Sequence, residues 1–499
     1  MNRTMELKSL LDVLEEKQTF GNSDNIEIKG IVYDPLRVKP GFLFVAINIY
    51  TQLDKIEIPE GHEKVGEAID AGAVAVVLQR DMEVPENIVK ILVPDSRLAL
   101  AKLANHFYGY PSRKMKMIGI TGTNGKTTTT HILESILMQK YRAGLIGTLY
   151  YKINGKIHKS KDTTPEPPDL QEIFTHMVQE KVEYCAMEVS SHGIDFYRVE
   201  GVDYNVAVFT NLSQDHLDFH KTMDNYLTTK KKLFQWLDAD DFAIANIDDP
   251  HGHEFLEATK AKRISFGIKN SAVIMAKDIE FSIKGTKYTL VTPIGQITVS
   301  PKLVGMFNVY NSLAAVAVAF SQNFDLETIK QGLEAPIRVS GRFELVDHGQ
   351  PFSVVVDYAH TPDGMEKVLG LAEDLRPNRV ITVFGCGGDR DKDKRPKMGA
   401  VADKYSDVVI LTADNPRNED PNKIINEIAA GIKNAEKHVI VDRRDAIKFA
   451  LENAQENDII MILGKGHETT QTLKHETIHF NDVEETEKIL AEMGYNQRK

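Results

Sequence analysis

The chain has 499 residues and a formal net charge of −12, and 42% of its residues are hydrophobic, 8% aromatic and 26% charged. This composition is typical of a soluble globular protein and excludes a disordered or fibrous one. The acidic balance argues against a nucleic-acid binder, which needs a basic face, and the apolar runs are far shorter than the roughly 20 residues that cross a bilayer. We therefore expect no nucleic-acid partner and no membrane insertion, and the length favours about three domains.

The pattern of residues 1–112 favours a small α/β domain. Short apolar runs predict strands at 28–33, 42–46, 74–78 and 88–93. A helical period predicts a helix over 95–108, which ends before Tyr110-Pro111 because proline restricts the residue in front of it. Asp95-Ser96-Arg97 stands at the start of this helix, where we expect it to cap the first turn.

Residues 113–336 and 337–499 each alternate strands with helices. In the central part the pattern predicts a helix over 126–139 and strands at 115–120, 184–189, 206–210 and 242–245. In the last part it predicts strands at 353–357, 380–384, 408–412, 439–441 and 459–463. We therefore predict an α/β fold of three domains: the small N-terminal one, a central P-loop mononucleotide-binding domain with a mainly parallel sheet, and a C-terminal Rossmann-like domain. Ligands are expected at the carboxyl ends of the parallel strands.

A glycine-rich turn joins the first central strand to its helix, with the sequence Thr121-Gly122-Thr123-Asn124-Gly125-Lys126-Thr127-Thr128. The glycines let successive backbone N–H groups point into one concavity at a helix N-terminus. Lys126 can reach the terminal phosphates of a nucleotide, and the Thr127 hydroxyl can bind Mg²⁺. The turn therefore predicts ATP or GTP binding, although Ile120 stands where the full consensus has a further glycine.

Two candidate metal ligands follow other central strands. Glu188 lies at the end of the strand before Val189-Ser190-Ser191, and His216 follows Thr210-Asn211. Either residue alone is more often a structural loop residue. As a pair downstream of a phosphate loop, a carboxylate and an imidazole favour one or two hard cations beside the phosphates.

Five motifs in order resemble those of the Mur ligase family, and within it the MurE type. They are Thr121–Thr127, Glu188–Gly193, Thr210–His220, Gly305–Asn311 and Asp357–Asp363, and the resemblance spans nearly the whole chain. It implies that Lys126, Thr127 and Glu188 hold ATP with one Mg²⁺ and that His216 helps to hold a second. It also implies that Lys230, in Tyr226–Phe234, is carbamylated, which turns a metal-repelling ammonium into a carboxylate-like ligand.

The same resemblance assigns further roles around the nucleotide. Asn308 and Asn311 are placed near the base, Arg342 near the phosphates and Asp357 at the ribose, with His360 on the same strand-end loop. The implied reaction converts a substrate carboxylate into an acyl phosphate, which the amine of an amino acid then attacks. Lys126, Arg342 and the metal ions would offset charge during phosphoryl transfer.

Three loops at neighbouring strand ends of the last domain favour an amino-acid site. They carry Arg390, Asp414-Asn415-Pro416-Arg417 and Gly464 with Glu468. The arginines can each grip a carboxylate and Glu468 can take an ammonium, so the residues alone indicate an acidic amino acid. Asp-Asn-Pro-Arg resembles the signature of the relatives that add meso-2,6-diaminopimelate, whereas lysine-adding relatives lack the arginine.

The resemblance places the sugar-nucleotide substrate on Thr163, Thr164, Ser190 and Arg198, with Arg37 in the first domain. That domain departs from the family pattern, because Asp34-Pro35-Leu36-Arg37 replaces the usual Asp-Ser-Arg. The serine expected to touch the uridine is missing.

The leading hypothesis is a monomeric ligase that uses ATP to add meso-2,6-diaminopimelate to UDP-MurNAc-L-Ala-D-Glu in peptidoglycan synthesis. Alternatives are an L-lysine-adding ligase, a folylpolyglutamate synthetase-like ligase, and a catalytically silent ligase-like scaffold. The N-terminus lacks the apolar core of a signal peptide, and Cys185 and Cys386 lie far apart in or beside apolar stretches. We therefore expect a reducing, cytoplasmic setting.

Overall fold

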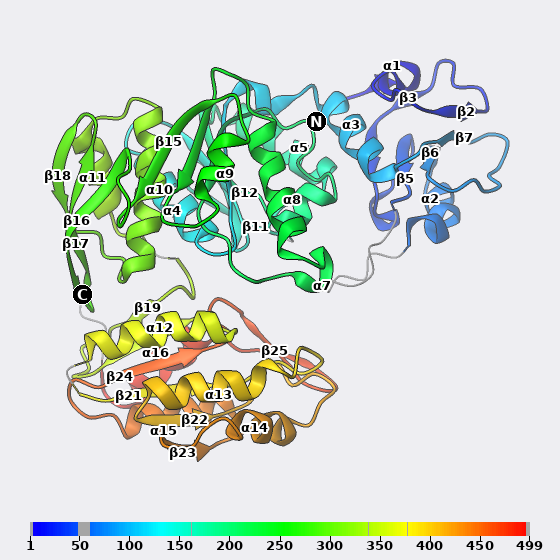
Figure 1. The fold of residues 1–499 in the computed structure, drawn as a ribbon. Coiled ribbons are helices and arrows are strands. Elements are labelled where there is room, and N and C mark those ends of the chain that lie inside the picture. The colour runs from blue at the N-terminus through cyan, green and yellow to red at the C-terminus, as the bar shows by residue number, and fades with distance from the viewer. Residues whose placement is uncertain (1–2, 48–59, 161, 338, 377, 496–499) are drawn as a thin grey trace. The chain divides into compact units, whose positions relative to one another are not determined.

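The structure is a computed structural model that describes residues 3–47, 60–160, 162–337, 339–376 and 378–495 (Figure 1). The chain forms two compact units. The first comprises Met1–Lys277, Thr289–Val299 and Phe307–Ala335, and the second comprises Asp278–Tyr288, Ser300–Met306 and Pro336–Lys499. None of the helices in the described part of the chain combines the length and apolar character that a membrane crossing needs.

The N-terminal part of the first unit is built on a sheet with the strand order β2-β7-β6-β5-β4. Its strands are β2 (Gln18–Phe20), β4 (Gly30–Val32), β5 (Phe42–Val45), β6 (Ala73–Leu78) and β7 (Val89–Leu92), all parallel except β2. A short pair, β1 (Met5–Glu6) and β3 (Glu27–Ile28), and helices α1 (Leu7–Leu11), α2 (Val65–Asp70) and α3 (Ser96–Tyr108) complete it. Asp95 caps α3 as expected, since its carboxylate accepts from the N–H groups of Arg97 and Leu98 at 2.9 and 3.0 Å.

Residues 116–299 contribute the strands of a long sheet with the order β11-β10-β9-β12-β8-β13-β14-β15-β16-β17-β18. The strands from β9 to β15 in this order are parallel: β9 (Ala143–Ile146), β12 (Tyr184–Glu188), β8 (Lys116–Thr121), β13 (Tyr204–Phe209), β14 (Phe242–Asn246) and β15 (Lys262–Gly267). The outer strands are β10 (Tyr150–Ile153), β11 (Lys156–Lys159), β16 (Ile274–Ser282), β17 (Gly285–Thr292) and β18 (Gly295–Val299). The predicted central strands are present, whereas the hairpin β10–β11 was not predicted.

Helices follow the central strands and bury the apolar rows that parallel strands carry on both faces. They are α4 (Lys126–Leu137), α5 (Pro167–Gln179), α6 (Ser191–Asp195), α7 (Leu217–His220), α8 (Met223–Gln235), α9 (Gly252–Glu257), α10 (Met306–Ser321) and α11 (Leu326–Glu334). Met117, Met187 and Phe209 are fully buried in the core. Because β8, β12 and β13 are adjacent and parallel, the loops after them meet at one edge of the sheet.

The second unit contains a sheet with the order β19-β20-β24-β21-β22-β23. Its strands are β19 (Glu344–Val346), β20 (Ser353–Asp357), β21 (Val380–Phe384), β22 (Val408–Leu411), β23 (Glu436–Val439) and β24 (Ile459–Leu463), all parallel except β19. The helices are α12 (Pro362–Leu375), α13 (Lys394–Tyr405), α14 (Pro421–Ala429), α15 (Arg443–Glu452) and α16 (Asp482–Glu492), and β25 (Thr470–Thr472) pairs with β26 (Thr477–His479).

One predicted strand of this unit was misplaced. We predicted a strand at 439–441, but β23 covers Glu436–Val439. The strand lies at the edge of the sheet, where charged side chains are tolerated and protect the unpaired backbone, so its sequence is mostly polar. The apolar run that follows it was mistaken for the strand.

A buried arginine fixes two loops of the second unit to each other. Arg395, on α13, has no exposed surface and donates to Glu419 at 3.0 Å, to Glu427 at 2.7 Å and to the Gly387 carbonyl at 3.2 Å. The hydrogen bond from Arg395 lowers the pKa of Glu419 to about 2 from its ordinary 4.5. Glu419 also accepts from the Asp389 N–H at 2.6 Å, so the pair holds the loop after β21.

Replacing Arg395 with Met should lower the free energy of unfolding by about 3 kcal/mol at pH 7, because two carboxylates lose their buried cation. Since the folded-state pKa of Glu419 is lowered, the stability it contributes is present above pH 4.5 and is lost as the pH falls toward 2. Denaturant unfolding followed by circular dichroism, from pH 7 to pH 3, measures both effects. An Arg395→Met variant as stable as the wild type at pH 7 would contradict this assignment. The control is Lys404→Met, which removes exposed contacts with Glu366 and Tyr405.

Candidate active site

The phosphate loop has the geometry of an anion site. β8 ends at Thr121 and α4 begins at Lys126, with Gly122 and Gly125 at φ +143° and +87°. A Cβ at Gly122 would lie 1.9 Å from the Thr210 hydroxyl, so only glycine fits there. The same hydroxyl donates to the Asn124 carbonyl at 2.7 Å, which ties the loop to the end of β13. Backbone N–H groups at a helix start attract phosphate oxygens, as predicted for this loop.

Lys126 and Asn311 both lie against the backbone of this loop. The Lys126 ammonium donates to the carbonyls of Gly122 and Thr123, both at 2.9 Å. Asn311, buried on α10, accepts from the Thr129 hydroxyl at 3.4 Å and donates to Asn308 at 3.0 Å. The two asparagines therefore support the loop and the first turn of α4, while the expected contact with a base remains a prediction.

Glu188, at the end of β12, connects the phosphate loop to the loop that carries Thr148. It is 1% exposed, and its Oε2 accepts from the Thr127 hydroxyl at 3.0 Å and from the Thr148 hydroxyl at 3.1 Å. Its Oε1 accepts from the Thr148 N–H at 2.9 Å. The predicted pair of Thr127 and Glu188 is therefore assembled, and Thr148 is a residue of the site that sequence reasoning missed, since it follows a short strand that was not predicted.

Lys230 is buried beside this cluster. It lies on α8 at 1% exposure, donates to the Gly122 carbonyl at 3.0 Å and stands 4.3 Å from the centre of the Tyr226 ring. Burial lowers its pKa well below the ordinary value, and the charge of Lys126 lowers it further. A neutral amine is the form that reacts with CO₂, so this environment suits carbamylation. Lys231 and Lys232 instead pair with Glu254 and Asp195 near the surface.

His216 stands at the start of α7 with φ +54° and lies beside His192, with 4.8 Å between ring centres. Among the described residues, no three His, Cys, Asp or Glu side chains converge as a metal cluster. The oxygen donors of Thr127 and Glu188 nevertheless suit Mg²⁺, which commonly uses one or two carboxylates together with substrate phosphates. The second cation site, with His216, remains a prediction.

The residues predicted for the sugar-nucleotide lie next to Glu188. The Thr164 hydroxyl donates to the Glu188 carbonyl at 3.1 Å and lies 3.1 Å from the Ser190 hydroxyl. The hydroxyls of Thr163 and Thr148 are 3.0 Å apart. Arg198 donates to the Thr164 carbonyl at 3.2 Å. These four predicted residues therefore form one connected group.

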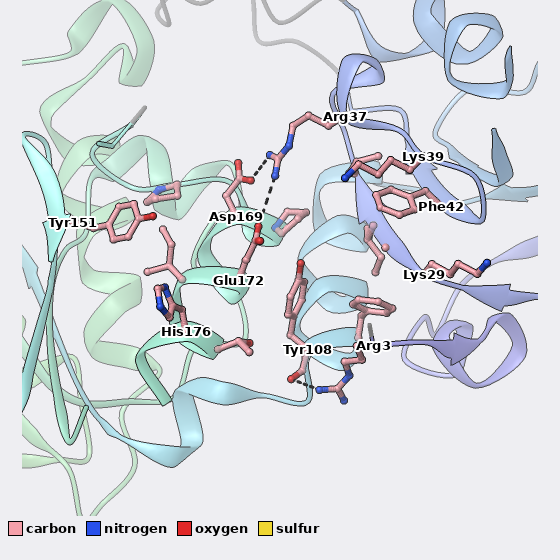
Figure 2. Close-up of a pocket in the computed structure, with 18 of the residues that line it drawn as sticks. Arg3, Lys29, Arg37, Lys39, Phe42, Tyr108, Tyr151, Asp169, Glu172 and His176 are labelled. Atoms are coloured by element: carbon pink, nitrogen blue, oxygen red, sulfur yellow. Dashed lines mark hydrogen bonds and ion pairs between the residues drawn. The ribbon is translucent and has the colours of Figure 1, made fainter. Parts of the chain in front are cut away.

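Arg37 takes a different position, on the wall of a cavity of about 920 Å³ between β4 and α5 (Figure 2). It is paired with Asp169, and Tyr33 donates to the same carboxylate at 2.9 Å. The altered motif forms a turn in which the Asp34 carboxylate accepts from the Leu36 N–H at 3.0 Å, leaving Leu36 90% exposed. Figure 2 shows Arg37 reaching toward Asp169 and Glu172, with Lys29 and Phe42 on the opposite wall.

In the second unit, Asp357 organises the loop that carries Arg342. Its buried carboxylate accepts from the N–H groups of Phe343 and Ala359 at 2.6 and 2.8 Å. Burial raises the pKa of Asp357, although the charge of Arg342 lowers it. The Arg342 guanidinium stands 5.3 Å from the centre of the Tyr358 ring, and His360 contacts the Tyr358 carbonyl at 2.8 Å.

The two arginines predicted for the amino acid flank one glycine. A Cβ at Gly387 would lie 2.9 Å from Arg417 and 3.7 Å from Arg390. Loss of solvent lowers the pKa of Arg390, and the positive charge of the nearby Arg417 lowers it further. A ligand with a carboxylate would relieve this repulsion.

Lys465 is the residue of this site that sequence reasoning missed. It is fully buried and donates to Glu468 at 3.1 Å, to Asn415 at 3.4 Å and to the Thr470 carbonyl at 2.7 Å. Asn415 also donates to Glu468 at 2.8 Å, and Asp414 lies buried with a pKa raised by burial. The signal for Lys465 was its place between Gly464 and Gly466, directly after the apolar strand β24.

Comparison with known proteins adds an independent finding. The profile of the Mur ligase middle domain matches residues 120–319, and that of the Mur ligase glutamate ligase domain matches residues 341–466. The chain is 44% identical to a UDP-N-acetylmuramoyl-L-alanyl-D-glutamate–2,6-diaminopimelate ligase of Bacillus licheniformis, over 98% of this chain and 100% of the relative. A ligase of the same name from Caldanaerobacter subterraneus is 45% identical, over 97% and 99%. A solved structure with this name has a TM-score of 0.70 at 31% identity, over 98% and 99%.

Replacing Lys230 with Met should raise the free energy of unfolding by about 1 kcal/mol at pH 7, in metal-free buffer from which carbonate has been removed. The reason is that the folded-state pKa of Lys230 is lowered, so folding must keep the amine neutral. The stability of the wild type should therefore rise as the pH increases toward 10.5, and that of the variant should not. Lys231→Met is the matched control. A Lys230→Met protein less stable than the wild type would show that burying the Lys230 amine does not cost the folded state free energy.

Proposed function

The chain belongs to the Mur ligase family, and on that premise we propose that it uses ATP to join meso-2,6-diaminopimelate to UDP-N-acetylmuramoyl-L-alanyl-D-glutamate. The observation that carries this proposal is the arginine pair beside Gly387, in a chain aligned over its whole length with ligases of that name. This alignment leaves the folylpolyglutamate synthetase-like and scaffold alternatives without support.

The site supports activation of a substrate carboxylate by phosphorylation. The phosphate loop and Lys126 would bind the ATP phosphates, and an oxygen of the substrate carboxylate would attack the γ-phosphorus with release of ADP. The amine of the amino acid would then attack the acyl carbonyl, forming the amide and releasing phosphate. Both nucleophiles come from the substrates, so the protein only needs to position groups and offset charge.

Thr127, Glu188 and a carbamylated Lys230 are the proposed metal ligands, with His216 for a second Mg²⁺. Mg²⁺ held there would neutralise charge on the phosphate oxygens. Arg342, Asp357, Asn308 and Asn311 keep the nucleotide roles that the family resemblance implies. His360, on the same strand-end loop as Asp357, is the further proposed catalytic residue. We further propose a monomer of three domains, 1–112, 113–336 and 337–499, that works in the cytoplasm.

The amino-acid site favours diaminopimelate over lysine for an electrostatic reason. Diaminopimelate offers a second carboxylate, which Arg390 and Arg417 can bind between them, and its second amine can approach Glu468. Lysine has no second carboxylate, so it would leave two partly desolvated arginines without an anion.

Phosphate release by the purified protein tests the proposal. With ATP, Mg²⁺ and UDP-N-acetylmuramoyl-L-alanyl-D-glutamate, release should depend on meso-2,6-diaminopimelate and be much slower with L-lysine. Faster release with lysine would overturn the choice of amino acid. No release with either would overturn the ligase activity.

Replacing Arg417 with Ala should raise the KM for diaminopimelate roughly a hundredfold, because a charge-assisted contact with a carboxylate is lost. The KM for ATP should stay unchanged. Arg444→Ala, which removes an arginine paired with Glu485 and Glu492 in the same unit, is the control. A rise in the KM for ATP would show that Arg417 belongs to the nucleotide site and not to the amino-acid site.

A further inference from the structure

A single buried carboxylate, Glu166, is shared by two arginines from distant parts of the chain. Arg97, in the first turn of α3, donates to Glu166 Oε1 at 3.2 Å, and Arg198, after α6, donates to the same oxygen at 2.9 Å. The side chains of Arg97, Arg198 and Glu166 are 7%, 5% and 1% exposed. Both guanidinium groups also lie over the Phe196 ring, at 4.8 and 5.6 Å from its centre.

Such a cluster strongly restricts where its members can lie. Buried charges tolerate little displacement, because moving Arg97 away would leave the buried Glu166 with the guanidinium of Arg198 in place of two guanidinium groups. Glu166 is therefore held in place from two sides, by the N-terminal α/β part of the unit through Arg97 and by the central part through Arg198.

Glu166 in turn determines the position of the loop before it. It directly precedes α5 and lies two residues after Thr164, whose carbonyl accepts from Arg198 at 3.2 Å. The Thr164 hydroxyl reaches the Glu188 carbonyl and Ser190, both at 3.1 Å. The ion cluster and the proposed sugar-nucleotide site thus share one short segment, 163–166.

A second link joins the same two parts of the unit but is less buried. Tyr33 and Arg37 contact Asp169, on the first turn of α5, at the wall of the cavity (Figure 2). The side chains of Arg37 and Asp169 are 36% and 21% exposed, so water can replace much of what this contact provides. The buried cluster at Glu166 therefore restrains the Thr163–Thr164 loop more strongly than the contact at Asp169 does.

We propose that Arg97 is a positioning residue for the UDP-linked peptide substrate, acting through Glu166 on the Thr163–Thr164 loop. The proposal rests on the function proposed above and adds a role for a residue of the N-terminal part that lies outside the uridine motif. The sequence accounted for Asp95-Ser96-Arg97 only as a helix cap. In the structure Asp95 makes the cap, which leaves the Arg97 side chain available to hold Glu166.

Steady-state kinetics with each substrate varied in turn tests the proposal. Arg97→Met, which keeps the bulk of the side chain, should raise the KM for UDP-N-acetylmuramoyl-L-alanyl-D-glutamate roughly tenfold, equivalent to about 1.4 kcal/mol. The KM values for ATP and diaminopimelate should change by less than about twofold. Arg97→Lys should recover part of the loss, because it restores a cation to Glu166. Tyr33→Phe, which removes a contact with α5 but none with Glu166, should behave as the wild type.

A double-mutant cycle shows whether Arg97 acts through Glu166. In a Glu166→Gln background, Arg97→Met should have little additional effect on the KM for the UDP-linked substrate. Independent effects of the two substitutions would overturn the proposal, as would an unchanged KM or an equal rise in all three KM values. Should Arg97→Met fold poorly, the same comparison is made with Arg97→Lys alone. An inactive wild type would instead refute the proposed function, and this proposal with it.

Discussion

The hydrogen bonds of Glu188 connect three loops of the proposed nucleotide and sugar-nucleotide sites in the first unit. Its side chain accepts from Thr127 in the phosphate loop and from Thr148 after β9, while its own carbonyl accepts from Thr164. These three loops are far apart in the sequence and meet because β9, β12 and β8 are parallel neighbours. At 1% exposure the carboxylate accepts from Thr127 and Thr148, while Thr164 binds the backbone carbonyl, so a small shift of one loop affects the other two through Glu188.

The second unit holds two arginines close together, which their like charges oppose. Arg390 and Arg417 flank Gly387, and the loop after β21, which carries Arg390, is held by Arg395 through Glu419. Lys465 plays the corresponding part on the other side, because it offsets the charge of Glu468. In both cases a buried basic side chain, Arg395 or Lys465, holds part of the proposed amino-acid site through an acidic partner.

Sequence reasoning succeeded where the parallel sheet dictates position. Apolar strands could be recognised from their composition, and residues just after them had to meet at one edge, which is why Arg390 and Arg417 were expected together. The pairing of Thr127 with Glu188 came from the family resemblance, and the cation site expected at Glu188 and His216 stays a prediction. It failed where position depends on packing between distant segments. Thr148 follows a strand that was not predicted, and Lys465 stands between two glycines after a strand, but its contacts with Glu468 and Asn415 are visible only in the structure. Arg97 was interpreted only as part of the helix cap that its neighbour Asp95 makes. The strand β23 was misplaced because edge strands carry polar residues.

Burial of the cysteines has a practical consequence for experiments on domain movement. Both cysteines of the chain, Cys185 and Cys386, are buried, and burial raises the pKa of each thiol, that of Cys386 to about 12. At neutral pH neither offers an accessible thiolate, which is the form that maleimides and spin labels attack. Leu36, at 90% exposure on the turn beside the cavity, is therefore a position where an introduced cysteine would carry a fluorophore or spin label selectively, with the native thiols left in place.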